Sequence, residues 1–441
     1  MADGMSESEG PEIDNPGGLL PLTASAEVQG QVPPRLLRQL LRRAPEAAQI
    51  PLFRNYVLGL APLALGSWMQ LVALGYLTLQ VTGSAAAVGL VGAADGIPAV
   101  LLSLPAGVAG DRHSRRAVLM GASAAMGLTA LGLALAAALD RATLPVLLGA
   151  AICFGSADAF DAPTRQALVA DIVPSRQLMG AAALTATVGS VTRIVGPAVG
   201  GVLLATLGPA SCFLAMAFSV VPFLVVLLLS HWPVVPVVAA RLGTVRRMVE
   251  GLRWSRADAA SRTVLIASLA LGVLGIGYMP YLPVFNRELL HGGGQVLGLM
   301  YSVGGIGAMV GGIGLSLMSR RLRQDRLLLG SAPLYALSLF GLTRATTLAL
   351  ALPCLAGISL GFLGASTAML TVLQARAPGE MRARVLSLYT LTFAGGGPLG
   401  TLVYAGASRI VPLFDAIAGG AVVVGLILLW SGSHRALRRL N

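Results

Sequence analysis

Charged residues are scarce in this sequence: Asp, Glu, Lys and Arg together make up 11% of its 441 residues. A soluble domain carries about 25% charged residues, so this chain lacks the charge needed to cover a water-exposed surface of its size. Hydrophobic residues make up 55% of the sequence, and the mean hydropathy is +0.78. The composition therefore excludes an ordinary soluble enzyme and favours an integral membrane protein.

Lysine is absent, and cysteine and histidine are rare. The three cysteines, Cys153, Cys212 and Cys354, are far apart within apolar runs, and the four histidines show no ligand spacing. We therefore expect no disulfide, no metal site and no cofactor. The sequence also lacks a phosphate-binding loop and any nucleophile paired with a base, which predicts that it is not an enzyme and does not use ATP directly. Arginine alone supplies the basic residues behind the net charge of +12, and membrane topology explains this better than nucleic-acid binding.

Long apolar segments fill the chain from about residue 55 onward. A membrane-spanning helix needs about 20 such residues. The sequence predicts twelve spans, at residues 57–81, 85–109, 116–139, 143–164, 177–205, 209–231, 262–286, 295–318, 325–344, 347–372, 384–407 and 410–432.

Arginine is distributed unevenly between the two sets of loops. If the N-terminus is cytoplasmic, 26 of the 31 arginines fall in inner segments, four fall in outer segments and Arg193 lies within a span. Basic residues accumulate on the cytoplasmic side of membrane proteins. The sequence therefore predicts that both termini are cytoplasmic.

The longest inner loop divides the chain into two halves of six spans. We expect a cytoplasmic tail over 1–50, a six-helix bundle over 51–231, a cytoplasmic linker over 232–261, a second bundle over 262–432 and a basic tail over 433–441. Residues 1–32 have the composition of a disordered segment. Residues 34–49 fit either a short amphipathic helix at the membrane surface or a solvated basic linker. The two halves share a Gly-Pro element, at Gly196-Pro197 and Gly397-Pro398.

The loop after the second span reads Gly107-Val-Ala-Gly110-Asp111-Arg112-His113-Ser114-Arg115-Arg116. It resembles the signature loop of the major facilitator superfamily, although Ser114 replaces the usual glycine and the matching loop of the second half lacks the acid. The resemblance implies an all-α integral membrane fold of twelve transmembrane helices in two pseudo-symmetric six-helix bundles. It also implies a conformational latch facing the start of the eleventh helix, formed by Gly107, Gly110, Asp111, Arg112, Arg115 and Arg116.

A second motif lies in the fifth span, where Gly196-Pro197-x-x-Gly200-Gly201 resembles the motif of the superfamily's antiporters and exporters. The glycine expected earlier in the motif is Thr192 here, and a packing kink without bearing on transport direction remains the alternative. Segments such as Asp161-Ala-Pro163 resemble the bacterial branch that includes the enterobactin exporter and macrolide-efflux relatives. That resemblance implies efflux across the bacterial cytoplasmic membrane.

Charged residues within spans are costly in lipid and are therefore candidates for function. Arg193 needs an anion, and we expect Asp158 to supply it, either as a fixed brace or as a proton-responsive pair. Asp161 has Arg165 one helical turn away, which favours a local ion pair. Asp95 has no cation nearby in sequence, so we expect it to carry the proton; a water-exposed carboxylate at a cavity mouth is the alternative.

Several polar residues within spans are candidates for a substrate path, although each one could instead pack between helices. We interpret the chain as a secondary transporter that exports small amphiphilic, drug-like or siderophore-like molecules, driven by proton antiport. A proton-coupled importer and a non-transporting sensor or scaffold are the alternatives. The expected partners are a small-molecule substrate, the bilayer and the proton gradient, with no nucleic acid, and the protein is expected to be a monomer. The path candidates are Gln70, Tyr76, Tyr278, Tyr301, Gln374 and Tyr389.

The topology can be tested directly with reporter fusions. Fusions placed after residue 232 and at the C-terminus should both report a cytoplasmic location, because twelve spans return the chain to the side on which it began. A periplasmic signal at either position would show that a span has been miscounted.

Overall fold

The computed structural model describes residues 46–112, 114–230, 232, 244–318 and 323–434, without the side chains of residues 103, 104, 107–112, 244–248 and 318. These residues are almost entirely helical, and the described part of the chain contains no strand. Six long helices come first, and they are α3 (Pro51–Thr82), α4 (Ala85–Arg112), α5 (Arg115–Ala138), α6 (Leu144–Ile172), α7 (Leu178–Leu207) and α8 (Pro209–Leu229). After the amphipathic helix α9 (Thr244–Ala257) come α10 (Ala259–Ala270), η2 (Leu271–Ile276), η3 (Met279–Tyr281), α11 (Leu282–Glu288), α12 (Gly294–Met318), α13 (Gln324–Leu342), α14 (Leu348–Arg376), α15 (Gly379–Ala407) and α16 (Leu413–Ser433).

The twelve predicted spans all coincide with helical structure. Within the described residues, ten helical segments are long and apolar enough to cross a membrane. The other two predicted spans are α13, which begins with the polar triplet Gln324-Asp325-Arg326, and α15, which begins with charged residues and is rich in glycine. The expected all-α membrane fold is therefore confirmed, although hydropathy alone selects ten of the twelve helices.

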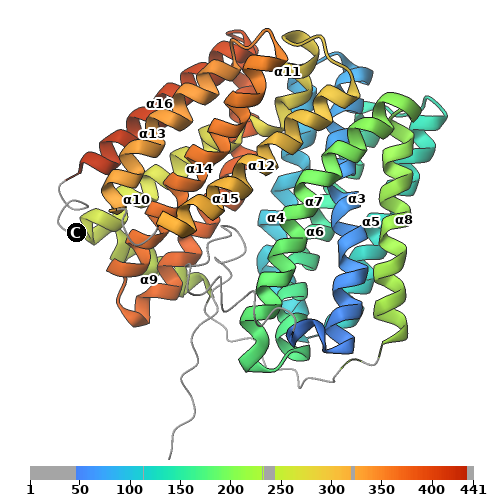
Figure 1. Cartoon of the computed structure of the whole chain (residues 1–441), viewed down its shortest axis with the longest axis horizontal. Coiled ribbons are helices and arrows are strands. Elements are labelled where there is room, and N and C mark those ends of the chain that lie inside the picture. Colours follow the sequence, from blue (N-terminus) through green and yellow to red (C-terminus); the bar gives the residue numbers. More distant parts are fainter. Residues whose placement is uncertain (1–45, 113, 231, 233–243, 319–322, 435–441) are drawn as a thin grey trace, which may run out of the picture.

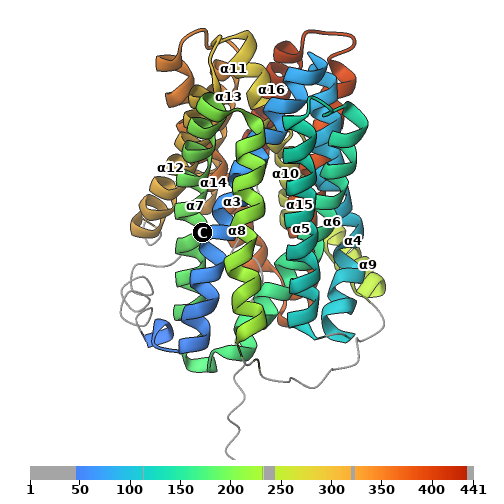
Figure 2. The same cartoon turned by 90° about the vertical axis from the view of Figure 1, so that its right-hand side faces the viewer.

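The helices form two groups that lie beside one another (Figure 1). In the N-terminal bundle, α3 packs against α7 and α8, while α5 and α6 pack together and α4 packs against α6. In the C-terminal bundle, α13 packs against α14 and α16, α12 packs against α14, and α15 packs against η2. Two long contacts join the bundles, α7 with α12 and α4 with α15 (Figures 1 and 2).

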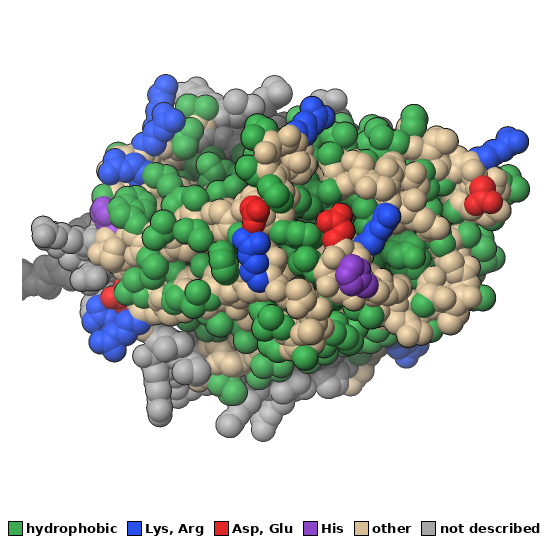
Figure 3. Space-filling model, turned by 90° about the horizontal axis from the view of Figure 1, so that it is seen from above, with side chains coloured by type: hydrophobic (Ala, Val, Ile, Leu, Met, Phe, Trp, Pro, Cys, Tyr) green, Lys and Arg blue, Asp and Glu red, His purple; other side chains and the backbone are tan. Residues whose placement is uncertain are grey.

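The two ends of the bundles differ in the elements they carry. The helix α11 lies at one end and α9 lies toward the other, and we call these the α11 end and the α9 end (Figure 1). Seen from the α11 end, a few charged side chains stand among many hydrophobic ones (Figure 3). Many leucines, valines and isoleucines on the outer faces of the helices are exposed, as expected for a surface that contacts lipid.

The seventh predicted span is not one regular helix. It consists of α10, the π-helical stretch η2, the single 3-10 turn η3 and the short helix α11. Pro280 and Pro283 remove two backbone donors from this span, so some carbonyl groups lose their helical partners. Tyrosines from neighbouring helices donate to carbonyls of the same irregular stretch: Tyr335 donates to the Gly275 carbonyl at 2.6 Å, and Tyr404 donates to the Leu274 carbonyl at 2.6 Å. Side-chain hydrogen bonds from neighbouring helices therefore help to stabilise the irregular stretch.

Glycines allow the bundles to approach closely. A Cβ atom on Gly298 of α12 would collide with the Pro197 carbonyl and the Gly201 backbone of α7. On the other contact, a Cβ atom on Gly96 of α4 would collide with the Pro398 ring of α15. Small residues bring helix backbones together in membranes, where hydrophobic burial gives no driving force between helices.

The α7–α12 contact predicts an asymmetry between two glycines of α12. Gly298→Ala should destabilise the protein by about 1–3 kcal/mol, because the added methyl group meets backbone atoms that have no room to move. Gly304→Ala is the matched control, since a Cβ atom there comes only to ordinary contact distance from Ser359. Thermal unfolding in detergent should give a clearly lower Tm for Gly298→Ala than for Gly304→Ala, and equal Tm values would contradict this packing.

Candidate functional site

A cavity of about 210 Å³ lies between the two bundles. Its walls come from α3 and α4 on one side and from η2, η3, α12 and α15 on the other. Most lining residues are apolar or glycine, which is typical of small-molecule sites. The polar side chains on its wall are those of Gln70, Asp95, Tyr301 and Thr401. Three of the residues singled out from the sequence, Gln70, Asp95 and Tyr301, thus meet at one place.

The bundles are in contact on the α11 side of this cavity. Arg287 of α11 donates to the Leu79 carbonyl near the end of α3 at 3.1 Å. Cβ atoms on Gly75 and Gly92 would press against the rings of Pro283 and Pro280. The α11 end is therefore the closed end of the space between the bundles.

Three carboxylates from α4 and α6 lie near one another. Asp161 is buried and forms an ion pair with Arg165 at 2.6 Å, as its spacing predicts. Asp158 interacts electrostatically with Asp95 across the α4–α6 contact and with Arg165 on its own helix. The close approach of these helices depends on Gly155, where a Cβ atom would collide with the Asp95 carbonyl.

Asp158 lies close to the middle of α6 and is exposed. Each residue turns an α-helix by about 100°, so Asp158 points away from Ile152 and Cys153, which are exposed on the lipid-facing side of the same helix. Its exposed surface therefore faces the space between the bundles and not the lipid.

The expected ion pair between Asp158 and Arg193 is not formed among the described residues. The Arg193 guanidinium lies over the ring of Trp68, with its central carbon 5.2 Å from the ring centroid. The physical reason is that α7 and α6 pack against different helices. The helix α7, which carries Arg193, packs against α3 and α12, whereas α6 packs against α4 and α5. The helices α6 and α7 follow one another in the chain but make little contact with each other, so the predicted brace is wrong.

The Gly-Pro motif of α7 lies at the centre of this arrangement. Gly196 and Gly200 face α3, where Cβ atoms would meet Trp68 and Met69. Gly201 faces α12, where a Cβ atom would collide with the backbone of Gly298. The Pro197 carbonyl approaches the same glycine. The motif thus joins α7 to its own bundle and to the opposite bundle at once.

Most of the predicted latch lies outside the described side chains. Residues Gly107, Gly110, Asp111 and Arg112 belong to the last turns of α4, and their side chains are not described. Arg115 forms an ion pair with Asp171 at the end of α6, and Arg116 donates to the Leu228 carbonyl at 3.0 Å. These two arginines hold helices of the N-terminal bundle together at the α9 end.

The remaining path candidates differ in their surroundings. Tyr389 is buried and donates to the Ser366 carbonyl at 2.8 Å, so it connects α15 to α14 as a packing group. Tyr301 approaches the Met279 carbonyl at 3.4 Å while it lines the cavity. Tyr76, Tyr278 and Gln374 are partly buried and do not line the cavity. The sequence analysis missed Trp68, because nothing local marks it as the neighbour of Arg193.

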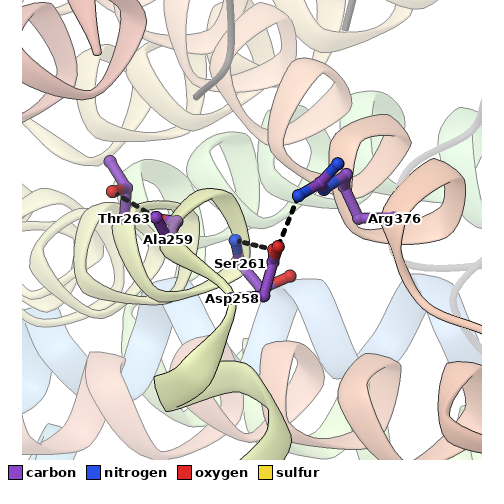
Figure 4. Close-up of polar contacts among 5 residues, drawn as sticks. All are labelled: Asp258, Ala259, Ser261, Thr263 and Arg376. Atoms are coloured by element: carbon purple, nitrogen blue, oxygen red, sulfur yellow. Dashed lines mark hydrogen bonds and ion pairs between the residues drawn. The ribbon is translucent and has the colours of Figure 1, made fainter. Parts of the chain in front are cut away.

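A charged cluster at the start of α10 fixes the α9 end of the C-terminal bundle (Figure 4). Asp258 accepts from the backbone N–H of Ser261 at 2.8 Å and from Arg376 of α14 at 2.5 Å. Burial of the carboxyl group opposes its ionisation, but the hydrogen bonds from Arg376 and Ser261 outweigh burial and lower the pKa of Asp258. Asp258 is therefore both the N-cap of α10 and a charged link to α14.

A family model described as transmembrane secretion effector, within the major facilitator superfamily, matches residues 49–437. The chain belongs to this family. Membership agrees with the two-bundle helical fold and with the resemblance found in its loops.

The chain is also similar to curated transporters in sequence and to a solved transporter structure in fold. The chain is 24% identical over 344 residues to the staphyloferrin A transporter of Staphylococcus aureus, covering 77% of this chain and 85% of that protein. It is 28% identical over 368 residues to the enterobactin exporter EntS of Citrobacter koseri, covering 80% and 82%. The fold is similar to that of a bacterial homologue of the iron transporter ferroportin in its inward-facing state, with 16% identity, a TM-score of 0.68 and coverage of 87% and 99%.

Asp258 allows a prediction about stability and pH. Asp258→Asn keeps a capping side chain but loses the charge, and it should lower the free energy of unfolding by about 0.5–1 kcal/mol. Asp258→Ala loses the cap as well and should lower the free energy of unfolding by about 1–2 kcal/mol. The pKa of Asp258 in the folded protein lies below the usual value of 3.8. Its charge therefore contributes fully to the stability of the fold above pH 3.8, and that contribution is lost only as the pH falls below this value.

The measurement is the Tm of each variant in detergent across pH. The difference in Tm between wild type and Asp258→Asn should stay constant from neutral pH down to mildly acidic pH and should shrink only below pH 3.8. Asp415→Asn is the control, since its ion pair with Arg344 is about half exposed on both sides and should contribute less. A gap that changes near neutral pH would contradict the assignment.

Proposed function

We propose that this protein is a secondary active transporter that exports small amphiphilic molecules by alternating access and proton antiport. The observation that carries the proposal is the cavity between the bundles, which is mostly apolar but places Asp95, Gln70 and Tyr301 on its wall. A substrate bound there contacts both bundles, so rocking of one bundle against the other changes the side from which it is accessible.

The relatives support a siderophore-like or drug-like substrate and outward transport. One of them is described as a staphyloferrin A transporter and another as an enterobactin exporter. Outward transport also agrees with the Gly-Pro motif of α7, which resembles that of the superfamily's exporters. The substrate of this chain is expected to be amphiphilic because the cavity wall combines large apolar areas with a few polar groups.

We further propose that the α9 end faces the cytoplasm, as the arginine distribution predicts. The bundles touch at the α11 end, so the protein is then in an inward-facing state. In that state a cytoplasmic substrate reaches the space that Asp158 and Arg193 face. Asp111 would hold the α9 end closed in the opposite state, where its charge would complement the start of α15 near Arg382 and Arg384.

Asp95 is the proposed proton carrier. It lies on the cavity wall, and no described cation forms an ion pair with it. Asp158 interacts electrostatically with Asp95 and is the second candidate for proton carrier, because it also interacts with Arg165. Asp161 is held by Arg165 and is less suited to exchange a proton.

Direction and energy source can be tested together in cells and vesicles. Cells that produce the protein should accumulate less of some members of a panel of dyes, antibiotics and siderophores than cells without it, and an uncoupler should remove the difference. Everted vesicles should take up the same compounds when energised. Greater accumulation in producing cells would indicate an importer and would overturn the proposal.

The proton carrier gives a sharper prediction. Asp95→Asn should abolish uphill transport in proteoliposomes but retain downhill exchange, because the substrate path remains while the titrating group is lost. Asp140→Asn, in an exposed turn between α5 and α6, is the control and should transport at the wild-type rate. Uphill transport by Asp95→Asn would remove Asp95 from the mechanism, and loss of coupling in Asp158→Asn would then assign the role to Asp158.

A further inference from the structure

Arg193 is an arginine in the middle of a membrane-spanning helix without a carboxylate partner in the described part of the chain. Its only described side-chain contact with a ring is that with Trp68, and none of the described ion pairs includes it. Charged side chains at this depth are costly in lipid and normally pair with an opposite charge or line a water-filled space. The absence of an anion beside Arg193 among the described side chains therefore requires a physical reason.

The direction of the side chain supplies the first part of that explanation. Arg193 projects from the side of α7 opposite to four exposed valines, which mark the lipid-facing side of the helix because each residue turns it by about 100°. Arg193 is nonetheless exposed. Its exposed surface therefore faces the space between the bundles. The four valines are Val191, Val195, Val199 and Val202.

The surroundings of Arg193 place it beside the cavity. Gly305 of α12 packs against Arg193, because a Cβ atom on Gly305 would contact both the backbone and the side chain of Arg193. Gly305 lies one helical turn from the cavity residue Tyr301. Trp68 precedes the cavity residue Gln70 by two positions on α3. The guanidinium thus lies one turn toward the α9 end from the cavity, on the surface that a substrate crosses on its way in.

The structure holds this guanidinium in place without neutralising it. The ring of Trp68 carries the guanidinium on one face, and a cation–π contact of this kind orients a cation while leaving its N–H donors available. The backbone of Gly196 packs directly against the base of the Trp68 side chain, since a Cβ atom there would collide with the Cβ atom of Trp68. An oriented guanidinium with free donors matches a planar oxyanion, which accepts two parallel hydrogen bonds.

We infer that Arg193 and Trp68 form an anion-binding subsite, and that the transported molecules carry a carboxylate or a similar planar oxyanion. This inference rests on the proposed function and narrows its substrate class. The acids Asp95 and Asp158 come from α4 and α6, whereas the subsite comes from α3, α7 and α12. The substrate anion is thereby kept away from the carboxylates that would repel it.

Binding of a matched pair of probes tests the subsite. The fluorescent probes 2-naphthoate and 2-naphthamide share one ring system and differ in charge, so their affinities for the purified protein in nanodiscs isolate the contribution of the anion; empty nanodiscs give the background. Wild-type protein should bind 2-naphthoate at least about 10-fold more tightly than 2-naphthamide. Equal affinities, or no saturable binding of either probe, would overturn the subsite.

Variants assign the preference to Arg193. Arg193→Gln should reduce the ratio of the two affinities to about one, and Arg193→Lys should retain part of it, because lysine keeps the charge but loses the planar fork. Arg409→Gln changes an exposed arginine at the α11 end and should leave the ratio unchanged. Variants are compared only when they elute as wild type does in size-exclusion chromatography, and Arg193→Lys supplies the test if Arg193→Gln fails to fold. An undiminished ratio in a folded variant would overturn the proposal.

The same proteins separate this inference from the proposed function. If 2-naphthoate binds through Arg193 but no compound of the panel shows uncoupler-sensitive export, the transport proposal fails and the subsite stands. If export is present but wild-type protein does not distinguish the two probes, the subsite fails and the transport proposal stands.

Discussion

Two close backbone contacts between the bundles, α7 with α12 and α4 with α15, are the constraint on which the rest of the structure depends. Inside a bilayer, lipid tails are as apolar as leucine, so helices gain little from burying leucine against leucine and associate where small residues allow close approach. Gly201 and Gly298 meet in the first contact, and Gly96 meets Pro398 in the second. These contacts also help to position the cavity, because α4, α12 and α15 each contribute to its walls.

The two contacts are related by the repeat within the chain. Pro197 lies in the fifth helix of the first bundle and Pro398 in the fifth helix of the second. Each motif also packs on the first helix of its own bundle: Gly200 on α3, and Gly400 on the backbone of η2 near Val273. One short sequence element, used twice, therefore positions both bundle interfaces. A change at either motif would alter helix packing within a bundle and between bundles at the same time.

Hydropathy and local spacing predict the parts of this protein that depend on nearby residues. Ten of the twelve helical segments follow from their hydropathy, and the Asp161–Arg165 ion pair follows from a spacing of one helical turn. The break in the seventh span was not predicted, because hydropathy does not register the loss of backbone donors at Pro280 and Pro283. The side chains that donate to carbonyls of this span, Tyr335 and Tyr404, come from distant parts of the sequence. A single sequence contains no signal that would join them to that span.

The failed prediction for Arg193 shows what such long-range contacts change. From the sequence, an acid within the preceding span was the expected partner, and pairing with Asp158 would have neutralised both charges. The packing of α7 on α3 and α12 instead separates a cation on Trp68 from acids on α4 and α6. An intramembrane charge that is left without a counter-ion is costly unless it faces water. Such charges are suited to reversible binding: the acids can bind and release a proton, and the arginine, as inferred above, can bind and release an anionic substrate.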